Sequence, residues 1–139
     1  MLFKIKMIKK PESYWKEKLS PEKYNILRGK NTEMPGTGNL LYNKKKGVYM
    51  CGACGNLLFS SKEKFDSGTG WPSFYEVAAK GNIKLEQDFS HGMSLAEVVC
   101  AKCGSHLGHV FNEEKTEKFP TGKRYCINSM ALDFREEEK

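Results

Sequence analysis

Residues 51–55 read CGACG and residues 100–104 read CAKCG, and these two stretches constrain the fold more than any other part of the sequence. Each contains a Cys-x-x-Cys pair that follows a strand-like run and precedes a glycine. Two intervening residues allow both sulfurs of a turn to point at one ion, and glycine tolerates the left-handed backbone that such a tight knuckle often needs. Each stretch therefore predicts a metal-binding knuckle.

Together the two knuckles offer four thiolates, which suit the tetrahedral coordination of zinc. Residues 55–99 separate the pairs, so one ion would join distant parts of the chain. A site filled by four sulfurs leaves no position for water, so we expect a structural ion that contributes on the order of 10 kcal/mol to folding. An iron–sulfur cluster or two disulfides would use the same pairs, and the pattern leaves these alternatives open. The expected ligands are Cys51, Cys54, Cys100 and Cys103.

The sequence pattern changes at Gly47: from there on, short apolar runs are separated by glycine-containing turns. This spacing is typical of an antiparallel β domain, so the sequence predicts a mainly β fold. The runs are residues 48–50, 57–59, 83–85 and 94–99. Between and after them, residues 76–79 are expected to form a helical turn, and residues 113–118 an exposed charged loop.

The N-terminal part of the chain predicts two short helices. Tyr14, Trp15 and Leu19 have rough helical spacing, and we assign Trp15 to packing. The run Ser20-Pro21-Glu22 reads as an N-cap, a proline at the first helical position and an early acid. Residues 31–39 contain one proline and two glycines and are expected to be irregular. We expect a single domain with three parts: an arm (1–39), a zinc-clamped β core (40–134) and a frayed, solvated tail (135–139).

The composition narrows the class of protein further. With 39% hydrophobic residues in 139, the chain can bury a core. The net charge of +6 comes mostly from scattered lysines, and the densest runs, at residues 9–10 and 44–46, are too short for a nucleic-acid stripe. No apolar stretch is long enough for a signal-peptide core or a membrane span. We therefore expect a cytoplasmic protein without a nucleic-acid or membrane partner, whose reduced cysteines favour metal over disulfides.

The hexapeptide RYCINS, near the C-terminus, holds the fifth cysteine of the chain, Cys126. If the run is extended, Arg124, Cys126 and Asn128 share one face, and Tyr125 and Ile127 point to the other. We interpret Cys126 as a nucleophile on a rigid strand, with Arg124 favouring its thiolate. A buried core cysteine is the alternative, because cysteine also packs as a hydrophobe. The hexapeptide alone does not decide between these two interpretations.

Two more segments carry unusual chemistry. Residues 64–74, KFDSGTGWPSF, set an aromatic residue after a glycine-rich turn, and residues 106–111, HLGHVF, hold two of the three histidines. Together with the knuckles and RYCINS, they resemble the methionine-(R)-sulfoxide reductases, the B-type family that repairs oxidised methionine. The resemblance covers about residues 15–134. It implies two antiparallel sheets closed like a tent or partial barrel, short N-terminal helices and a structural zinc site.

The resemblance also implies a mechanism. The cysteine that matches Cys126 attacks the sulfoxide sulfur, releases methionine and keeps a sulfenic acid. Histidine is well suited to protonate the departing oxygen near neutral pH. The family's histidines match His106 and His109, of which we favour His109, and Gly108 is expected to permit a turn that brings both into one pocket.

The remaining site residues are expected around the substrate. An indole face makes a good wall for an S-methyl group, and Trp71 matches the family tryptophan in that role. Phe111 is a second candidate for substrate contact, and Asn128 matches a family position that hydrogen-bonds within the active site. Core packing for Trp71 and satisfaction of backbone groups by Asn128 are the alternatives. His91 falls in no family block and is assigned to a turn.

Two departures from the family pattern bear on function. Many relatives carry a resolving cysteine at the position of Thr69, and with the other four cysteines assigned to metal, an internal disulfide has no partner. We therefore expect an external reductant: thioredoxin, glutaredoxin or a small thiol. Residues 112–120 form a longer and more charged loop than the family's short turn. The expected partners are oxidised proteins or peptides and this thiol donor, with the chain acting as a monomer.

Two other classes of function compete with the reductase. Folds with two distant Cys-x-x-Cys knuckles also serve as binding modules, and a basic zinc ribbon of this kind would show a salt-dependent affinity for nucleic acid. Such a module needs neither Cys126 nor the two histidines of HLGHVF. A redox-sensing switch would ordinarily use a nearby resolving thiol, which Thr69 replaces.

Overall fold

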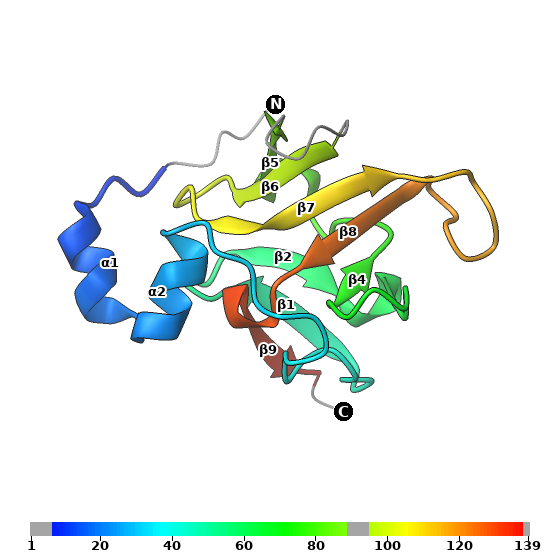
Figure 1. Cartoon of the computed structure of the whole chain (residues 1–139), viewed down its shortest axis with the longest axis horizontal. Helices are drawn as coiled ribbons and strands as arrows, with labels where there is room; N and C mark the ends of the chain where they lie inside the picture. Colours follow the sequence, from blue (N-terminus) through cyan, green and yellow to red (C-terminus); the bar gives the residue numbers. More distant parts are fainter. Residues whose placement is uncertain (1–6, 89–94, 138–139) are drawn as a thin grey trace.

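Two short helices and two β-sheets make up the fold in a computed structural model, which describes residues 7–88 and 95–137 (Figure 1). The helices are α1 (Glu12–Lys18) and α2 (Pro21–Leu27). The strands are β1 (Gly47–Cys51), β2 (Leu57–Ser60), β3 (Lys64–Phe65), β4 (Ser73–Phe74), β5 (Ile83–Asp88), β6 (Leu95–Cys100), β7 (His106–Asn112), β8 (Lys123–Ile127) and β9 (Leu132–Glu136). Within the described ranges, three 3-10 helices connect some of these strands: η1 (Ser61–Glu63), η2 (Lys80–Asn82) and η3 (Ser129–Ala131).

Every strand pairing among the described residues is antiparallel. One sheet has three strands in the order β2-β1-β9, and the other has six in the order β3-β4-β8-β7-β6-β5. The prediction of a mainly β fold with two antiparallel sheets and short helices at the N-terminus is therefore confirmed. Neither helix in the described part of the chain is long and apolar enough to cross a membrane.

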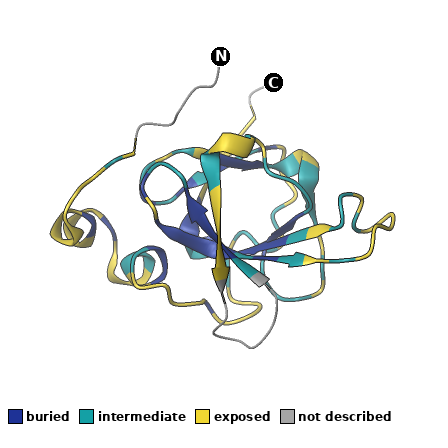
Figure 2. Cartoon of the chain, turned by 90° about the horizontal axis from the view of Figure 1, so that it is seen from above, coloured by how far each residue is buried: buried dark blue, intermediate teal, exposed yellow. Residues whose placement is uncertain are grey.

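Aromatic side chains from both sheets form the core between them. The Phe59 ring from β2 stacks on the Phe74 ring from β4 with centroids 4.4 Å apart. Tyr49 from β1 meets the same Phe74 ring at 5.1 Å, and Tyr125 from β8 lies 5.8 Å from Phe59. Buried residues gather in the strands at the centre of the molecule, with exposed residues in the outer loops (Figure 2). Aromatic pairs of this kind add to the stability that apolar burial provides.

The N-terminal helices pack beside the sheets and extend the core. Trp15 is 1% exposed and lies in the hydrophobic core cluster. The Ser20 side chain accepts a hydrogen bond from the Lys23 backbone N–H at 3.3 Å, so the predicted N-cap of α2 is confirmed. Residues 31–39 are irregular, as expected, and they pass close to the end of β8, where the site described below begins.

Two local predictions were wrong. Residues 76–79 do not form a helical turn, because the Ala78 backbone N–H bonds to the Leu58 carbonyl of β2 instead, and the 3-10 helix η2 starts at Lys80. The predicted tail begins too early, because β9 continues through Arg135 and Glu136, which pair with β1. The charged loop at residues 113–118 is confirmed. His91, assigned to a turn, lies outside the described residues.

Candidate active site and metal centre

The two cysteine knuckles follow the same backbone path. In the first, the Cys51 N–H bonds to the Asn56 carbonyl and the Gly55 N–H bonds back to Cys51. In the second, the Cys100 N–H bonds to the Ser105 carbonyl, and the Gly104 N–H bonds back to the Cys100 carbonyl. The closing glycines have φ values of 81° and 76°, the left-handed conformation predicted for them. The same local sequence therefore produces the same turn twice.

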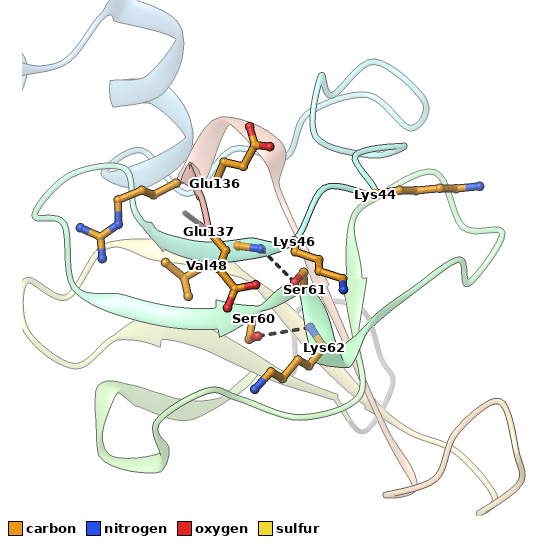
Figure 3. Close-up of a pocket in the computed structure, with 10 residues that line it drawn as sticks. Lys44, Lys46, Val48, Ser60, Ser61, Lys62, Glu136 and Glu137 are labelled. Atoms are coloured by element: carbon orange, nitrogen blue, oxygen red, sulfur yellow. Dashed lines mark hydrogen bonds between the residues drawn. The ribbon is translucent and has the colours of Figure 1, made fainter. Parts of the chain in front are cut away.

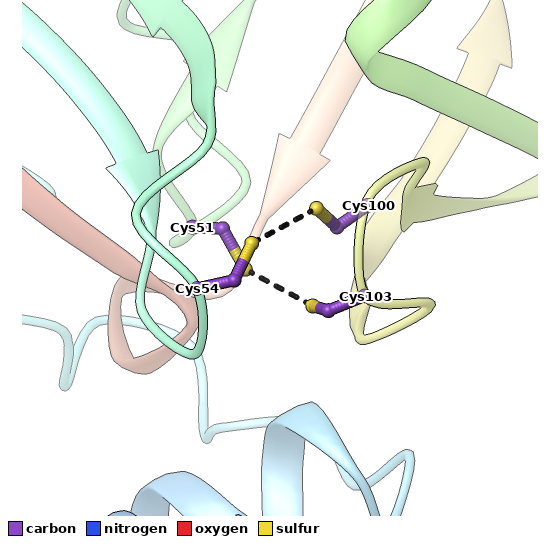
Figure 4. A group of neighbouring side chains, drawn as sticks. All are labelled: Cys51, Cys54, Cys100 and Cys103. Carbon is purple, nitrogen blue, oxygen red and sulfur yellow. Dashed lines mark hydrogen bonds between the residues drawn. The ribbon is translucent and has the colours of Figure 1, made fainter. Parts of the chain in front are cut away.

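The knuckles bring four sulfurs from two distant parts of the chain to one point (Figure 4). All four lie within 4.8 Å of one another. The Sγ atoms of Cys51 and Cys103 are 3.7 Å apart, and those of Cys54 and Cys100 are 3.6 Å apart. Four sulfurs held tetrahedrally around zinc lie about 3.8 Å from one another, whereas disulfide sulfurs lie about 2.05 Å apart. These separations are compatible with a single tetrahedral ion, and all four cysteines are free rather than joined in disulfides.

Polar groups around the sulfurs complete the metal centre. The Arg28 guanidinium donates to the Cys103 carbonyl at 2.8 Å, and the Ser105 hydroxyl lies 3.1 Å from the Cys103 sulfur. Hydrogen bonding with Cys100 lowers the pKa of Cys103 and raises the pKa of Cys51. Thiols this close cannot all ionise unless a cation lies between them. The four cysteines could therefore hold one metal ion.

Cys126 belongs to a row of side chains that crosses four adjacent strands of the larger sheet. In the strand register, Glu97 on β6 is opposite His109 on β7, His109 is opposite Cys126 on β8, and Cys126 is opposite Ser73 on β4. Directly opposed residues of antiparallel strands place their side chains on the same face of the sheet. An acid, an imidazole, a thiol and a hydroxyl therefore stand side by side.

The sulfur of Cys126 is surrounded by hydrogen-bonding groups. Arg124 Nη1 donates to Cys126 Sγ at 3.0 Å. The hydroxyls of Ser73 and Thr69 lie 3.6 and 3.7 Å from the same sulfur. The Ser67 hydroxyl lies 2.7 Å from each of these two hydroxyls, so the three form one network. Cys126 is thus set in a polar environment with one fixed cation, although it is only 8% exposed.

The guanidinium of Arg124 is held from two further directions. Its Nε donates to Glu113 Oε1 at 2.9 Å, and its plane lies over the Phe111 ring at 4.3 Å from the centroid. Phe111, predicted as a substrate contact, therefore packs under the arginine. The predicted division of faces on β8 also holds, because Tyr125 and Ile127 lie in the hydrophobic core.

The two histidines reach one face through a β-bulge. On β6, Val98 pairs with Gly108 and Val99 pairs with His106, so Leu107 is an extra residue on β7. Side chains alternate along a strand, and the extra residue turns His106 to the same side as the histidine three positions later. The prediction that Gly108 permits a turn was wrong, because Gly108 lies inside β7. A Cβ there would lie 2.1 Å from the carbonyl oxygen of Cys126, so glycine allows β8 to approach.

The imidazole rings of His106 and His109 meet edge to face, with centroids 5.5 Å apart. His106 Nδ1 lies 2.6 Å from the Glu97 carboxylate, and Lys30 Nζ lies 3.5 Å from the same acid. Burial lowers the pKa of His106, and the hydrogen bond with Glu97 partly opposes this. With Nδ1 donating to the carboxylate, the neutral ring presents Nε2 as an acceptor. This Nε2 is buried and has no hydrogen-bond partner among the described residues.

Trp71 and Asn128, two other predicted site residues, are both tied to Glu33 in the irregular arm. The Trp71 indole N–H donates to the Glu33 carbonyl at 3.0 Å. The Asn128 side-chain oxygen accepts from the Glu33 N–H at 3.0 Å, and its NH₂ group donates to the Leu107 carbonyl at 3.1 Å. Asn128 follows the last residue of β8, so strand alternation does not place it. Both of these side-chain hydrogen bonds are to backbone groups.

Sequence reasoning missed several residues around this site, among them Glu97, Ser73 and Glu33. Glu97 had a readable signal, because it is the one charged residue in the apolar run LAEVVC. Charged residues are rarely buried without a partner, so an acid in an interior strand points to a paired site. Ser73 and Glu33 carry no such signal, since serine and glutamate are common in turns and loops.

A separate hollow of about 890 Å³ lies on the smaller sheet (Figure 3). It is lined by β1, β2 and β9 and by basic and acidic side chains that include Lys46, Lys62 and Glu137. None of the predicted catalytic or metal-binding residues lines this hollow. The candidate active site is therefore the row of side chains around Cys126.

A mainly β fold with a cluster of four cysteines, and with a fifth cysteine beside a guanidinium and opposite a histidine, is an arrangement that suits cysteine-based redox chemistry. The family model described as the SelR domain matches residues 19–136. The chain belongs to this family, whose relatives are named peptide methionine sulfoxide reductase MsrB.

Similarity to these relatives extends over most of the chain. The relative in Methanosarcina barkeri is 57% identical over 134 residues, which cover 96% of this chain and 92% of that protein. The relative in Methanosarcina mazei is 58% identical over 94% of this chain and 91% of its own length. The relative in Leptospira interrogans is 52% identical over 94% of this chain and 97% of its own length. The resemblance inferred from the motifs is thereby confirmed.

Proposed function

We propose that this methionine sulfoxide reductase acts on the R epimer of methionine sulfoxide in proteins and peptides, with Cys126 as its nucleophile. The observation that carries the proposal is the contact of 3.0 Å between Arg124 Nη1 and Cys126 Sγ. A fixed cation at this distance stabilises a thiolate, which is the form of cysteine that attacks. The alternative of a passive core cysteine leaves this contact without a role.

The reaction transfers one oxygen atom and two electrons. The Cys126 thiolate bonds to the sulfoxide sulfur while the sulfoxide oxygen is protonated. The oxygen then passes to the Cys126 sulfur as a sulfenic acid, and methionine leaves. The substrate sulfur gains two electrons and the cysteine sulfur loses two.

His109 is the proposed proton donor. It is opposite Cys126 in the strand register, so both side chains stand on one face of the sheet. His106 is the weaker candidate, because burial lowers its pKa and favours the neutral ring. We assign to His106 the role of orienting the His109 ring. Glu97 in turn holds the His106 ring through the contact of 2.6 Å.

An external thiol regenerates the enzyme in this proposal. Thr69 is 3.7 Å from Cys126 Sγ, and the other four cysteines form the metal cluster. One thiol displaces water from the sulfenic acid to form a mixed disulfide, and a second thiol releases Cys126. Comparing turnover with thioredoxin against glutathione plus glutaredoxin identifies the donor.

The metal in the four-cysteine centre is proposed to be zinc with a structural role. The sulfur separations of 3.6 and 3.7 Å support a single tetrahedral ion. When bound, zinc would supply a cross-link between the two knuckles and no chemistry at Cys126. Trp71 and Phe111 are proposed to face the substrate, Trp71 as the wall for its S-methyl group.

One assay tests the proposed function. Separate R and S epimers of a methionine sulfoxide peptide are supplied with dithiothreitol, and the loss of each is followed. We expect consumption of the R epimer only, and no consumption by Cys126→Ser. The variant must keep the circular dichroism spectrum and the metal content of the wild type, so that loss of activity reports chemistry. Turnover of the S epimer, or full activity of the variant, would reject the proposal.

A further inference from the structure

Glu33 connects three segments of the candidate active site through its backbone and its side chain. Its carbonyl accepts from the indole N–H of Trp71 at 3.0 Å, and its N–H donates to the side-chain oxygen of Asn128 at 3.0 Å. Its carboxylate Oε1 accepts from the Met130 N–H at 3.0 Å. Glu33 is only 8% exposed, so these bonds are shielded from water. Among the described residues that lie outside the strands and the knuckles, Glu33 is the one that is hydrogen-bonded to both Trp71 and Asn128.

The carboxylate is the anchor of this connection. Met130 lies in η3, which is separated by one residue from β8, the strand of Cys126. The second carboxylate oxygen, Oε2, and the hydroxyl of Ser129 are both buried, and neither has a hydrogen-bond partner in the described part of the chain. A Cβ on Gly38 would lie 2.4 Å from Oε2 and 2.1 Å from the Ser129 hydroxyl. The carboxylate therefore occupies a tight space that only glycine at position 38 leaves open.

The arm packs against the turn that carries Trp71. We call residues 33–38 the arm loop. The Gly36 N–H bonds to the Gly70 carbonyl at 2.8 Å, and a Cβ on Gly70 would lie 2.6 Å from the Pro35 side chain. The arm loop thus touches the residue directly before Trp71 as well as the indole itself. Movement of the arm loop would move the partner of the indole N–H.

We propose that Glu33 is a positioning residue that sets the orientation of the Trp71 indole by anchoring the arm loop to η3. This inference rests on the proposed function, in which the indole forms the wall for the substrate's S-methyl group. The backbone groups of Glu33 hold the indole and Asn128, and the carboxylate holds the backbone. Loss of the carboxylate therefore weakens substrate binding without changing the groups that surround the Cys126 sulfur.

The test compares Glu33→Ala with Glu33→Gln in the full chain. Glu33→Ala removes the acceptor for the Met130 N–H, and we expect KM for the R-sulfoxide peptide to rise roughly tenfold with little change in kcat. Glu33→Gln keeps an acceptor oxygen, so its KM should lie near that of the wild type. The rate of alkylation of Cys126 should be the same in all three proteins, because the Arg124 contact is untouched.

Indole emission supplies a readout that does not depend on turnover. In a Trp15→Phe background Trp71 is the remaining tryptophan, and its emission should shift in Glu33→Ala and stay unchanged in Glu33→Gln. Asp133→Ala is the matched control, since Asp133 also ties the N-terminal part to the same region through Lys23 at 3.1 Å. It should leave both KM and the emission of Trp71 unchanged.

Gly38→Ala is a second variant, for the case that Glu33→Ala does not fold. Its added Cβ would displace the Glu33 carboxylate, so we expect it to raise KM as well. The inference is overturned if the wild type reduces the R epimer but Glu33→Ala and Gly38→Ala leave KM and the emission unchanged. It is also overturned if kcat and the rate of alkylation of Cys126 fall while KM rises, because that pattern indicates general loss of structure. If the wild type has no reductase activity, the proposed function fails, while the emission still tests the anchoring of the indole.

Discussion

The metal centre and the candidate active site use the same reactive group in opposite ways. In the metal centre, four sulfurs lie within 4.8 Å of one another, so each thiol has other thiols as its neighbours. At the active site, one sulfur has a guanidinium at 3.0 Å and two hydroxyls at 3.6 and 3.7 Å. A thiolate that is shared with a metal ion is neutralised and closed to substrate, whereas a thiolate beside a fixed cation keeps its lone pairs for attack.

The two regions also differ in how the chain builds them. Each knuckle is local, because its bonds join residues that are close in sequence. The active site is assembled from four strands, and the partners of Cys126 come from β4, β7 and the turn that contains Thr69. The metal centre therefore depends on turn chemistry, and the active site depends on strand register.

Removal of the metal should have the largest effect. Cys103→Ser, or chelation of the metal, should unfold the domain, since a structural zinc site contributes on the order of 10 kcal/mol. Thermal unfolding followed by circular dichroism, together with metal analysis, measures this loss. Cys126→Ser is the control and should retain one metal ion and native unfolding. A metal-free protein with a native spectrum would contradict the structural role and remove the contrast between the two regions.

Loss of the cation at the active site should have the next largest effect. Arg124→Met removes the hydrogen bond to Cys126 Sγ, and the loss of a charge-assisted bond should slow alkylation of Cys126 roughly tenfold to a hundredfold near neutral pH. Arg124→Lys keeps the charge but lacks the planar guanidinium, so its rate of alkylation should lie between those of Arg124→Met and the wild type. Mass spectrometry of the peptide that contains Cys126 measures the rate. An unchanged rate in Arg124→Met would show that the guanidinium does not activate the thiol.

Loss of the acid behind His106 should have a smaller effect. Glu97→Gln removes the carboxylate that holds the imidazole, so kcat should fall about tenfold, less than the roughly 10²-fold or more expected for loss of the proton donor itself. Besides the fall in kcat, the pH dependence of kcat should change, because Glu97→Gln changes the charge near both histidines. Lys30→Gln also changes the charge near His106 but leaves its contact with Glu97 in place, so it is the control for kcat, which should stay near the wild-type value. A profile identical to that of the wild type would assign Glu97 to folding alone.

The smallest effect should be the dependence of stability on pH through His106. Its pKa is lowered by burial from the ordinary value of 6.5. Below about pH 6.5 the unfolded chain therefore takes up a proton that the folded chain does not, and the free energy of unfolding falls until the pH passes the folded pKa. Urea unfolding at about pH 7.5 and about pH 5.5 should show a smaller loss in His106→Gln than in the wild type. Equal losses would mean that this histidine is not the buried neutral group described above.

Local features of the fold and of the metal centre were readable from the sequence. The Cys-x-x-Cys-Gly runs predicted both knuckles and their left-handed glycines, and Ser20-Pro21-Glu22 predicted the start of α2. The alternation in RYCINS predicted that Arg124 and Cys126 share a face and that Tyr125 enters the core. Each of these depends on residues a few positions apart, where backbone geometry alone relates them.

Features that depend on which strands are neighbours could not be read in this way. The bulge at Leu107 and the close approach that requires Gly108 arise only when β7 lies between β6 and β8. The sequence analysis missed Glu97, and the lone acid in its apolar run would not have shown that it holds His106. The arm loop showed only a turn-rich composition, although Glu33 within it bonds to two of the predicted site residues.

The sequence by itself determined which cysteines can share a metal, which cysteine is left for chemistry and which face of its strand carries the cation. Only the tertiary structure decided which acid holds His106, how both histidines reach one face and what anchors the indole. The reason is physical: turns and strand alternation follow from the covalent geometry of a few adjacent residues, whereas strand order and register are set by burial of the whole core.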